Sequence, residues 1–312
     1  MPGIPGLVIA NAEQIAALTV ADAPAVVRAV EAEAPRGPRV AVVDYHKGNL
    51  MSVARGLQAA GADAFVTDDP AQVEAASAAV IPGVGAFDDA MSFMRESGLG
   101  RAVEGLARRG VPLLGICLGM QVLFARGDEH AAPPAPGEEP AWVPGLGLLA
   151  GDVTRLPAVG VKVPHVGWNT ACLTRTAARC PLFDGVPDET YFYFTHSYAC
   201  APEDGGVVTA TTEHGVRFAS AVWDGDALFG VQFHPEKSSE AGAAVLRNFV
   251  RLVAERAGVE PGGQAASPGA PTAPSSEPAA LTALSDAPAA PTGAARPGSP
   301  EAPSASREGA VR

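Results

Sequence analysis

Between residues 40 and 116 the sequence alternates short, β-branched apolar runs with longer amphipathic stretches, and this alternation restricts the possible folds more than any other feature. Strands are predicted over 40–44, 65–67, 79–82 and 112–116, and helices over 50–60, 87–96 and 101–109. Strands that alternate with helices form parallel sheets with helices on their faces. The pattern therefore predicts an α/β domain with a largely parallel central sheet, followed after residue 151 by a strand-rich second half.

Composition separates this domain from two flanking segments. Residues 1–37 are rich in alanine and include a helix-like stretch over 13–33 that Pro24 interrupts, so we expect an N-terminal extension that is partly helical or disordered. Residues 257–312 are mainly Ala, Pro, Ser and Gly without apolar periodicity, and such a segment cannot offset the entropy of ordering. We expect a disordered tail there and one folded domain over 38–256.

Charge and cysteine content narrow the class of function. The formal net charge of −12 disfavours nucleic acid as a partner, and no apolar run approaches the roughly 18 residues that span a bilayer. The cysteines lack C-x-x-C spacing and an accompanying histidine cluster, so neither a metal site nor a disulfide framework is predicted; they are Cys117, Cys172, Cys180 and Cys200. We expect a cytoplasmic protein with a small molecule or a protein as its partner.

The run VPLLGICLGMQVLF places one of these cysteines in a reactive setting. An apolar strand leads to Cys117, a helix-like segment begins at Leu118, and Gly115 and Gly119 flank the cysteine. Small residues on both sides permit the tight strand-to-helix turn of a nucleophile elbow. A cysteine after a strand is often only a buried apolar residue, but the paired glycines favour a nucleophile. At the start of a helix the thiolate is stabilised, and the N–H of Leu118 points toward a developing oxyanion.

A second glycine turn, Pro82-Gly83-Val84-Gly85, follows another predicted strand. Its backbone could direct an N–H group into the same pocket and complete an oxyanion hole. Such a turn is in most proteins only a tight loop, so both interpretations remain open.

The run ALFGVQFHPEKS supplies a base for the thiol. A predicted strand over 227–233 ends at His234, and in an extended chain Glu236 points the same way as His234 and can hold its imidazole from behind. A lone histidine at a strand end is usually structural, but the carboxylate and the cysteine elbow make His234 a candidate general base. His165 and His196 compete for this role, although neither has a carboxylate two residues later.

Six motifs, in this order, resemble those of the class I, or triad-type, glutamine amidotransferases, in which a G-x-C-x-G elbow and a distant H-P-E form a Cys-His-Glu triad. The motifs are DYHKGNL at 44–50, PGVGAF at 82–87, GICLGMQ at 115–121, KVPHVGWN at 162–169, HSY at 196–198 and GVQFHPEKS at 230–238. Across about 39–252 the resemblance is closest to the glutaminase subunits of imidazole glycerol phosphate synthase, because KVPHVGWN is not shared with the other amidotransferases.

This resemblance implies a three-layer fold and a reaction. Cys117 would attack the carboxamide of L-glutamine, ammonia would leave, and water would hydrolyse the thioester to glutamate. The ammonia would pass to a separate (β/α)₈-barrel cyclase subunit of imidazole glycerol phosphate synthase. That partner uses it to make imidazole glycerol phosphate and an aminoimidazole carboxamide ribotide in histidine biosynthesis. The glutaminase half of the heterodimer needs no cofactor or metal.

The resemblance also assigns roles by position. It implies oxyanion-hole backbone at Val84, Gly85 and Leu118; substrate contacts from Gln121, Glu129, Ser197 and Tyr198; and a partner-facing rim at Asn49, Trp168, Tyr193 and Lys237. It further implies that the loop amide reorients when the cyclase binds its ligand. Structural interpretations compete at the rim, where the aromatic residues could belong to the core, Asn49 could cap a helix and Lys237 could end a strand in solvent.

Two other functions stay open. The chain could be the amidotransferase subunit of another synthase, one that makes an aminobenzoate or a nucleotide, although Met120 and the KVPHVGWN segment disfavour this. It could also be a catalytically silent subunit that scaffolds or regulates a synthase, which the intact Cys, His and Glu set disfavours.

Overall fold

The computed structural model describes residues 37–46, 48–130 and 142–260 of the 312-residue chain, and all of them belong to one folded unit. The helix predicted near the N-terminus, most of the proline-rich segment after Glu129 and the tail beyond 260 lie outside the described residues.

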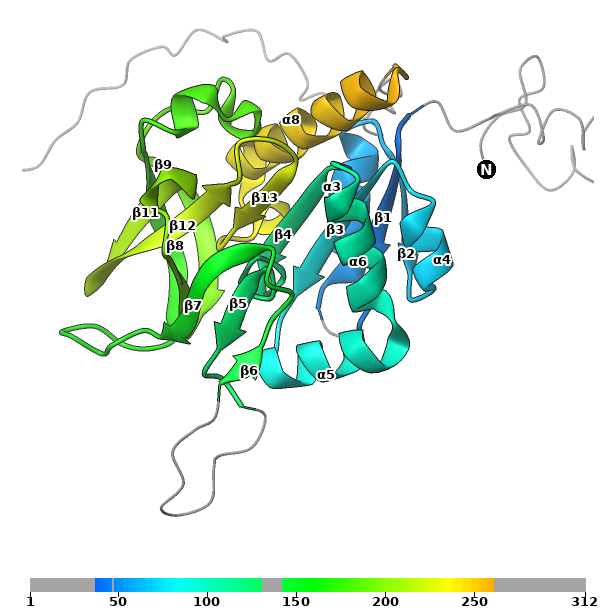
Figure 1. Cartoon of the computed structure of the whole chain (residues 1–312). Coiled ribbons are helices and arrows are strands. Elements are labelled where there is room, and N and C mark those ends of the chain that lie inside the picture. The colour runs from blue at the N-terminus through cyan, green and yellow to red at the C-terminus, as the bar shows by residue number, and fades with distance from the viewer. Residues whose placement is uncertain (1–36, 47, 131–141, 261–312) are drawn as a thin grey trace, which may run out of the picture. The chain divides into compact units, whose positions relative to one another are not determined.

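The first half of the fold is a parallel sheet built by the predicted alternation. Its strands lie in the order β2-β1-β3-β4-β13, and all neighbours are parallel (Figure 1). Their bounds are β1 Arg39–Val43, β2 Asp63–Thr67, β3 Ala78–Gly83, β4 Leu113–Cys117 and β13 Leu228–Val231. The carboxyl ends of parallel strands meet at one edge, so residues that follow β3, β4 and β13 come together there although they are far apart in sequence.

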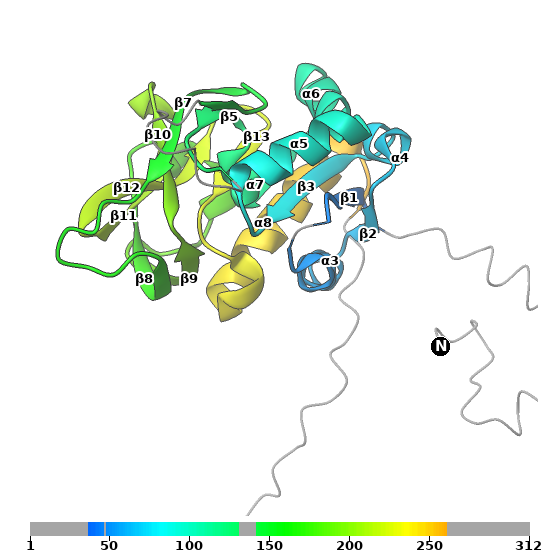
Figure 2. The ribbon, with the colours of Figure 1, turned by 90° about the horizontal axis from the view of Figure 1, so that it is seen from below.

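Helices cover both faces of this sheet. Figure 2 shows α4, α5 and α6 on one face and α3 and α8 on the other. Their bounds are α3 Leu50–Ala59, α4 Pro70–Glu74, α5 Phe87–Ser97, α6 Leu99–Arg108 and α8 Ser239–Ala257. Local signals explain the ends of several of them. The Asp69 side chain caps α4 by accepting from the N–H of Ala71, and Gly98 ends α5 with a φ of 82° before α6 begins.

The second half continues the sheet with antiparallel strands. Beyond β13 the order is β12-β11-β8-β9, which gives nine strands in all, and a smaller sheet has the order β10-β7-β5-β6. The bounds are β5 Phe124–Gly127, β6 Val143–Pro144, β7 Leu149–Arg155, β8 His165–Leu173, β9 Thr190–His196, β10 Tyr198–Pro202, β11 Val208–His214 and β12 Val216–Trp223. Short 3₁₀ helices, η1 Ala177–Arg179, η2 Pro181–Phe183 and η3 Gly205–Val207, lie in the connections. The α/β prediction is confirmed, but the sheet is mixed rather than largely parallel.

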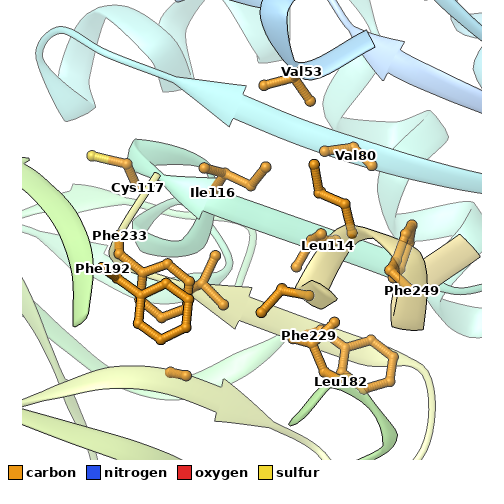
Figure 3. Packing of buried hydrophobic residues seen from close by; sticks show 14 of the residues in the cluster. Val53, Val80, Leu114, Ile116, Cys117, Leu182, Phe192, Phe229, Phe233 and Phe249 are labelled. Carbon is orange, nitrogen blue, oxygen red and sulfur yellow. The ribbon is translucent and has the colours of Figure 1, made fainter. Parts of the chain in front are cut away.

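Apolar side chains form one buried cluster on each face of the sheet. On the side of α3 and α8 the rings of Phe192 and Phe233 stack with centroids 3.9 Å apart, and at the other end of the same cluster Phe249 meets Phe229 with centroids 6.2 Å apart (Figure 3). Each large apolar side chain buried in this way contributes about 1.5–3 kcal/mol. Figure 3 also shows Cys117 at the border of this cluster, where β4 ends. Among the described residues, no helix is both long enough and apolar enough to cross a membrane.

Candidate active site

Cys117 occupies a strained turn between β4 and α7, a single helical turn over Leu118–Gln121. Its φ of 56° and ψ of −111° are rare for a residue with a side chain. The flanking glycines explain how the turn closes. A Cβ on Gly115 would lie 2.5 Å from the carbonyl oxygen of Gly119, and a Cβ on Gly119 would lie 1.5 Å from that of Ile81. The strand and the helical turn therefore approach each other as closely as the paired glycines predict.

His234 and Glu236 form a buried pair next to this turn. The Nδ1 of His234 lies 2.9 Å from Oε1 of Glu236, and the two side chains are 4% and 2% exposed. The route to this contact differs from the prediction, because residues Pro235–Lys237 form a 3₁₀ turn, η4, instead of an extended strand end. The backbone N–H of His234 donates to the carbonyl oxygen of Tyr193 at 2.9 Å, which fixes the histidine against β9.

The carboxylate determines which nitrogen of His234 carries the hydrogen. An ionised carboxylate only accepts, so Nδ1 of His234 is the donor, and in the neutral imidazole Nε2 is the free base. Nε2 is buried and makes no hydrogen bond to any other described residue. Burial by itself lowers the pKa of His234, but interactions with Cys117 and Glu236 outweigh it and raise this pKa to about 9. An imidazole of this kind can take the proton of the thiol and stabilise the resulting thiolate.

A pocket of about 310 Å³ opens in front of Cys117. Its lining contains the predicted oxyanion and substrate residues together: Val84, Gly85, Cys117, Leu118, Gln121, Glu129, Pro164, Thr195, His196, Ser197 and Tyr198. The volume is that of a small-molecule site. The glycine turn reaches this pocket because Gly83, at the end of β3, pairs in register with Cys117. As the first residue of α7, Leu118 keeps its N–H free of intrahelical bonds.

Glu129 has a structural role in addition to its place in the pocket. Its Oε2 accepts from the N–H of Phe87 at 3.0 Å, and its carbonyl oxygen accepts from the N–H of Asp88 at 3.3 Å. Glu129 therefore satisfies backbone donors at the start of α5. Burial raises its pKa to about 6.

Gln232 contacts the nucleophile, although the sequence did not single it out. Its Nε2 donates to Sγ of Cys117 at 3.5 Å, and the thiol itself donates to the carbonyl oxygen of Thr195 at 3.8 Å. Gln232 is fully buried. A signal was present, because Gln232 stands two residues before His234 and an extended chain points such residues to the same side.

The competing histidines form a separate, neutral chain. Nδ1 of His196 lies 2.8 Å from the carbonyl oxygen of Tyr198, which only accepts, so this nitrogen carries the hydrogen. Nε2 of His196 then accepts from Nδ1 of His165 at 3.0 Å, and Nε2 of His165 accepts from Asn169 at 3.2 Å. Burial lowers the pKa of His165 to about 4 and that of His196 to about 3. Both imidazoles are already committed in this chain, unlike that of His234.

The residues predicted at the partner-facing rim lie at the surface. Trp168 is 51% exposed and so is not a core aromatic residue. It pairs across the strands with Tyr193, their rings meet edge-on at 6.1 Å, and Nζ of Lys237 lies 5.8 Å from the centre of the Tyr193 ring. We call these three residues the aromatic patch. Asn49 is exposed at the start of α3, and its side chain makes no capping hydrogen bond.

Comparison with known proteins agrees with this geometry. Residues 41–253 match the family model for class I glutamine amidotransferases. The chain is 50% identical over 214 residues to the imidazole glycerol phosphate synthase subunit HisH of Moorella thermoacetica, which covers 69% of this chain and 95% of that protein. It is 45% identical over 217 residues to HisH of Thermosynechococcus vestitus, with 69% and 98% covered.

Among solved structures, the glutaminase domain of Trypanosoma brucei CTPS with bound acivicin has the same fold. The TM-score is 0.50 at 14% identity, and the match covers 72% of this chain and 95% of that one. PurLQS from Thermotoga maritima also gives a TM-score of 0.50, at 17% identity, with 70% and 99% covered.

Proposed function

Because the chain belongs to the class I glutamine amidotransferases and, within them, to the imidazole glycerol phosphate synthase HisH subunits, we propose that it hydrolyses L-glutamine and delivers the ammonia to a cyclase subunit. One observation carries the chemistry. The Cys117 turn faces a pocket of small-molecule size, next to a histidine whose far nitrogen is held 2.9 Å from a buried carboxylate. This arrangement suits acyl transfer through a thioester.

The first half of the proposed reaction forms the thioester. Nε2 of His234 takes the proton from Sγ of Cys117, and the thiolate attacks the carboxamide carbon of glutamine. The negative charge that develops on the amide oxygen is stabilised by the N–H of Leu118 and by an N–H of the Val84-Gly85 turn. When the C–N bond breaks, His234 returns the proton to the leaving nitrogen, and ammonia departs.

The second half releases glutamate. Water enters the pocket, and His234 accepts its proton while the oxygen attacks the thioester carbon. The tetrahedral intermediate uses the same backbone donors. Breaking of the C–S bond then frees glutamate and returns the proton to the Cys117 sulfur. Glu236 holds the imidazole through both halves and stabilises its protonated form.

The proposal includes a protein partner at the aromatic patch. Trp and Tyr side chains are enriched at protein interfaces; here Trp168 is exposed, Tyr193 is half-buried, and Lys237 adds a charge beside them. A cyclase seated on Trp168, Tyr193, Lys237 and the exposed Asn49 would collect ammonia close to its source. A synthase from another pathway remains the alternative partner, and the identity to HisH proteins disfavours it.

Residues 38–256 would carry the whole glutaminase, and the flanking segments would not be needed for its chemistry. We also propose a cytoplasmic location. The four cysteines of the chain are all free thiols, as is usual for proteins of a reducing compartment.

Replacing Cys117 by Ala, in the presence of the cyclase subunit of an imidazole glycerol phosphate synthase, tests the proposal. Synthesis of imidazole glycerol phosphate from glutamine should be abolished, whereas synthesis from added ammonium salt should continue. The matched control is Cys172→Ala, because this partly exposed cysteine lies on β8 outside the pocket and should leave both activities intact. A Cys117→Ala protein that still uses glutamine would contradict the proposed mechanism.

A further inference from the structure

A chain of three hydrogen bonds leads from the backbone of β10 to the reactive sulfur. Nε2 of Gln121 donates to the carbonyl oxygen of Tyr198 at 2.9 Å and to Oε1 of Gln232 at 3.1 Å. Nε2 of Gln232 then donates to Sγ of Cys117 at 3.5 Å. Gln121 and Gln232 are 3% and 0% exposed, so neither carboxamide exchanges these partners for bulk water.

The direction of this chain follows from its first member. The nitrogen and oxygen of a carboxamide are hard to distinguish by position alone, but a backbone carbonyl can only accept. Gln121 therefore turns its NH₂ group toward Tyr198 and, with the second hydrogen of that group, toward Gln232. Gln232 has to receive it with its oxygen, and its own NH₂ group is left facing the sulfur.

A donor directed at sulfur favours the thiolate over the thiol, because a hydrogen bond to the charged form is the stronger one. Among the described residues, His234, Tyr45 and Cys200 are titratable groups whose pKa values are affected by Cys117. Burial raises the pKa of Tyr45 and of Cys200, so these two stay neutral and do not repel the thiolate, and neither of them can offer it a positive charge. His234 and Gln232 are then the groups suited to stabilise it.

We infer that Gln232 is a further catalytic residue, whose carboxamide N–H stabilises the Cys117 thiolate, and that Gln121 positions it. The inference deepens the proposed glutaminase function and rests on it. It also restricts Gln121, because both of its amide hydrogens are used within the protein. Gln121 can meet the substrate only with its oxygen, as an acceptor for an N–H group of glutamine.

Alkylation of Cys117 by iodoacetamide, followed by mass spectrometry of the Cys117 peptide, tests this without substrate or partner. In the full chain, Gln232→Met should slow the reaction about tenfold near pH 7, because the thiolate is the form that is alkylated and it has lost a donor. The slowing should be much smaller near pH 10, where alkaline solvent favours the thiolate form of thiols in general. Gln121→Met frees the Gln232 carboxamide to rotate and should give a smaller change in the same direction. The matched control is Gln72→Met on exposed α4, which should react like the unchanged protein.

Equal rates for Gln232→Met and the unchanged protein at both pH values would overturn the inference. So would an equal slowing at both, because that reports a packing change and not a lost donor. If Gln232→Met does not fold, the alkylation rate of Gln121→Met is the deciding measurement. A rate equal to that of the unchanged protein would then contradict the inference. Glutaminase assays of the unchanged protein with cyclase are run in parallel. Their failure would reject the proposed function, whereas the alkylation rates would still judge the role of Gln232.

Discussion

Replacing His196 by Gln should weaken the acid sensitivity of the fold. Burial lowers the pKa of His196 to about 3, whereas in an unfolded chain it is about 6.5. Below pH 6.5 the unfolded chain therefore binds a proton that the folded protein excludes. The free energy of unfolding is therefore not reduced by His196 above pH 6.5, and it falls progressively as the pH decreases from 6.5 toward 3.

The size of the effect between pH 7 and pH 5 is nearly independent of how low the folded pKa is. At pH 5 the pH is about 1.5 units below the pKa of the imidazole in the unfolded chain, so that imidazole is protonated, while the imidazole in the folded protein is still neutral. At 1.36 kcal/mol per unit, His196 alone makes the free energy of unfolding about 2 kcal/mol smaller at pH 5 than at pH 7. A Gln at this position offers a donor for the Tyr198 carbonyl and an acceptor for His165, so the neutral chain can persist.

Urea unfolding at the two pH values, followed by tryptophan fluorescence, measures the difference. Other groups titrate in the same interval, so the test compares the change with pH in the two proteins and not the absolute values. His196→Gln should lose about 2 kcal/mol less than the unchanged protein on going to pH 5. Gln72→Met on exposed α4 serves as the control, because it replaces one uncharged side chain by another and should leave the pH dependence as it is. Identical losses with and without His196 would refute the reasoning.

The other two predictions concern Glu236 of the triad and Gly83, the residue at the end of β3 that pairs in register with Cys117. Glu236→Gln should reduce glutaminase turnover by about 10³-fold with little change in stability, because the carboxylate that orients and charges His234 is gone; activity within tenfold of normal would contradict its role. Gly83→Ala should lower the free energy of unfolding by about 1–3 kcal/mol, because its Cβ would lie 1.6 Å from the Tyr45 hydroxyl oxygen. Tyr45→Phe in the same chain should recover part of this loss in urea unfolding, and no recovery would show that the clash lies elsewhere.

The alternating half of the fold could be predicted because its signals are local. All seven helices and strands predicted over 40–116 are present, with bounds that differ by at most two residues. The five-residue helix α4 was not predicted, since Pro70 and the Asp69 cap set it more than any apolar periodicity does. The antiparallel half was predicted only as strand-rich. Pairing such as β8 with β9 depends on contacts that no single stretch of sequence contains.

The same distinction holds within the site. The elbow at Cys117 could be predicted because a glycine stands two positions away on either side of it, and the contact of His234 with Glu236 because the two residues stand only two positions apart. The contacts that Gln232 makes in the site could not be predicted in the same way. Gln232 meets Gln121 from 111 residues away and Cys117 from 115 residues away, so its role depends on which strands become neighbours.

The register between β4 and β13 connects the fold to the site. Gly230 lies opposite Gly115 and Val231 opposite Ile116, so one further step brings Gln232 level with Cys117. A slip of one residue would direct an apolar side chain at the sulfur, because successive side chains alternate between the two faces of a sheet. Gly230 lets β13 approach α7 closely, because a Cβ there would lie 2.7 Å from Cγ of Met120. Met120 and Gly230 do not line the substrate pocket, but their close packing holds the end of β13 against α7, and Gln232, the residue after that strand, reaches the nucleophile from there.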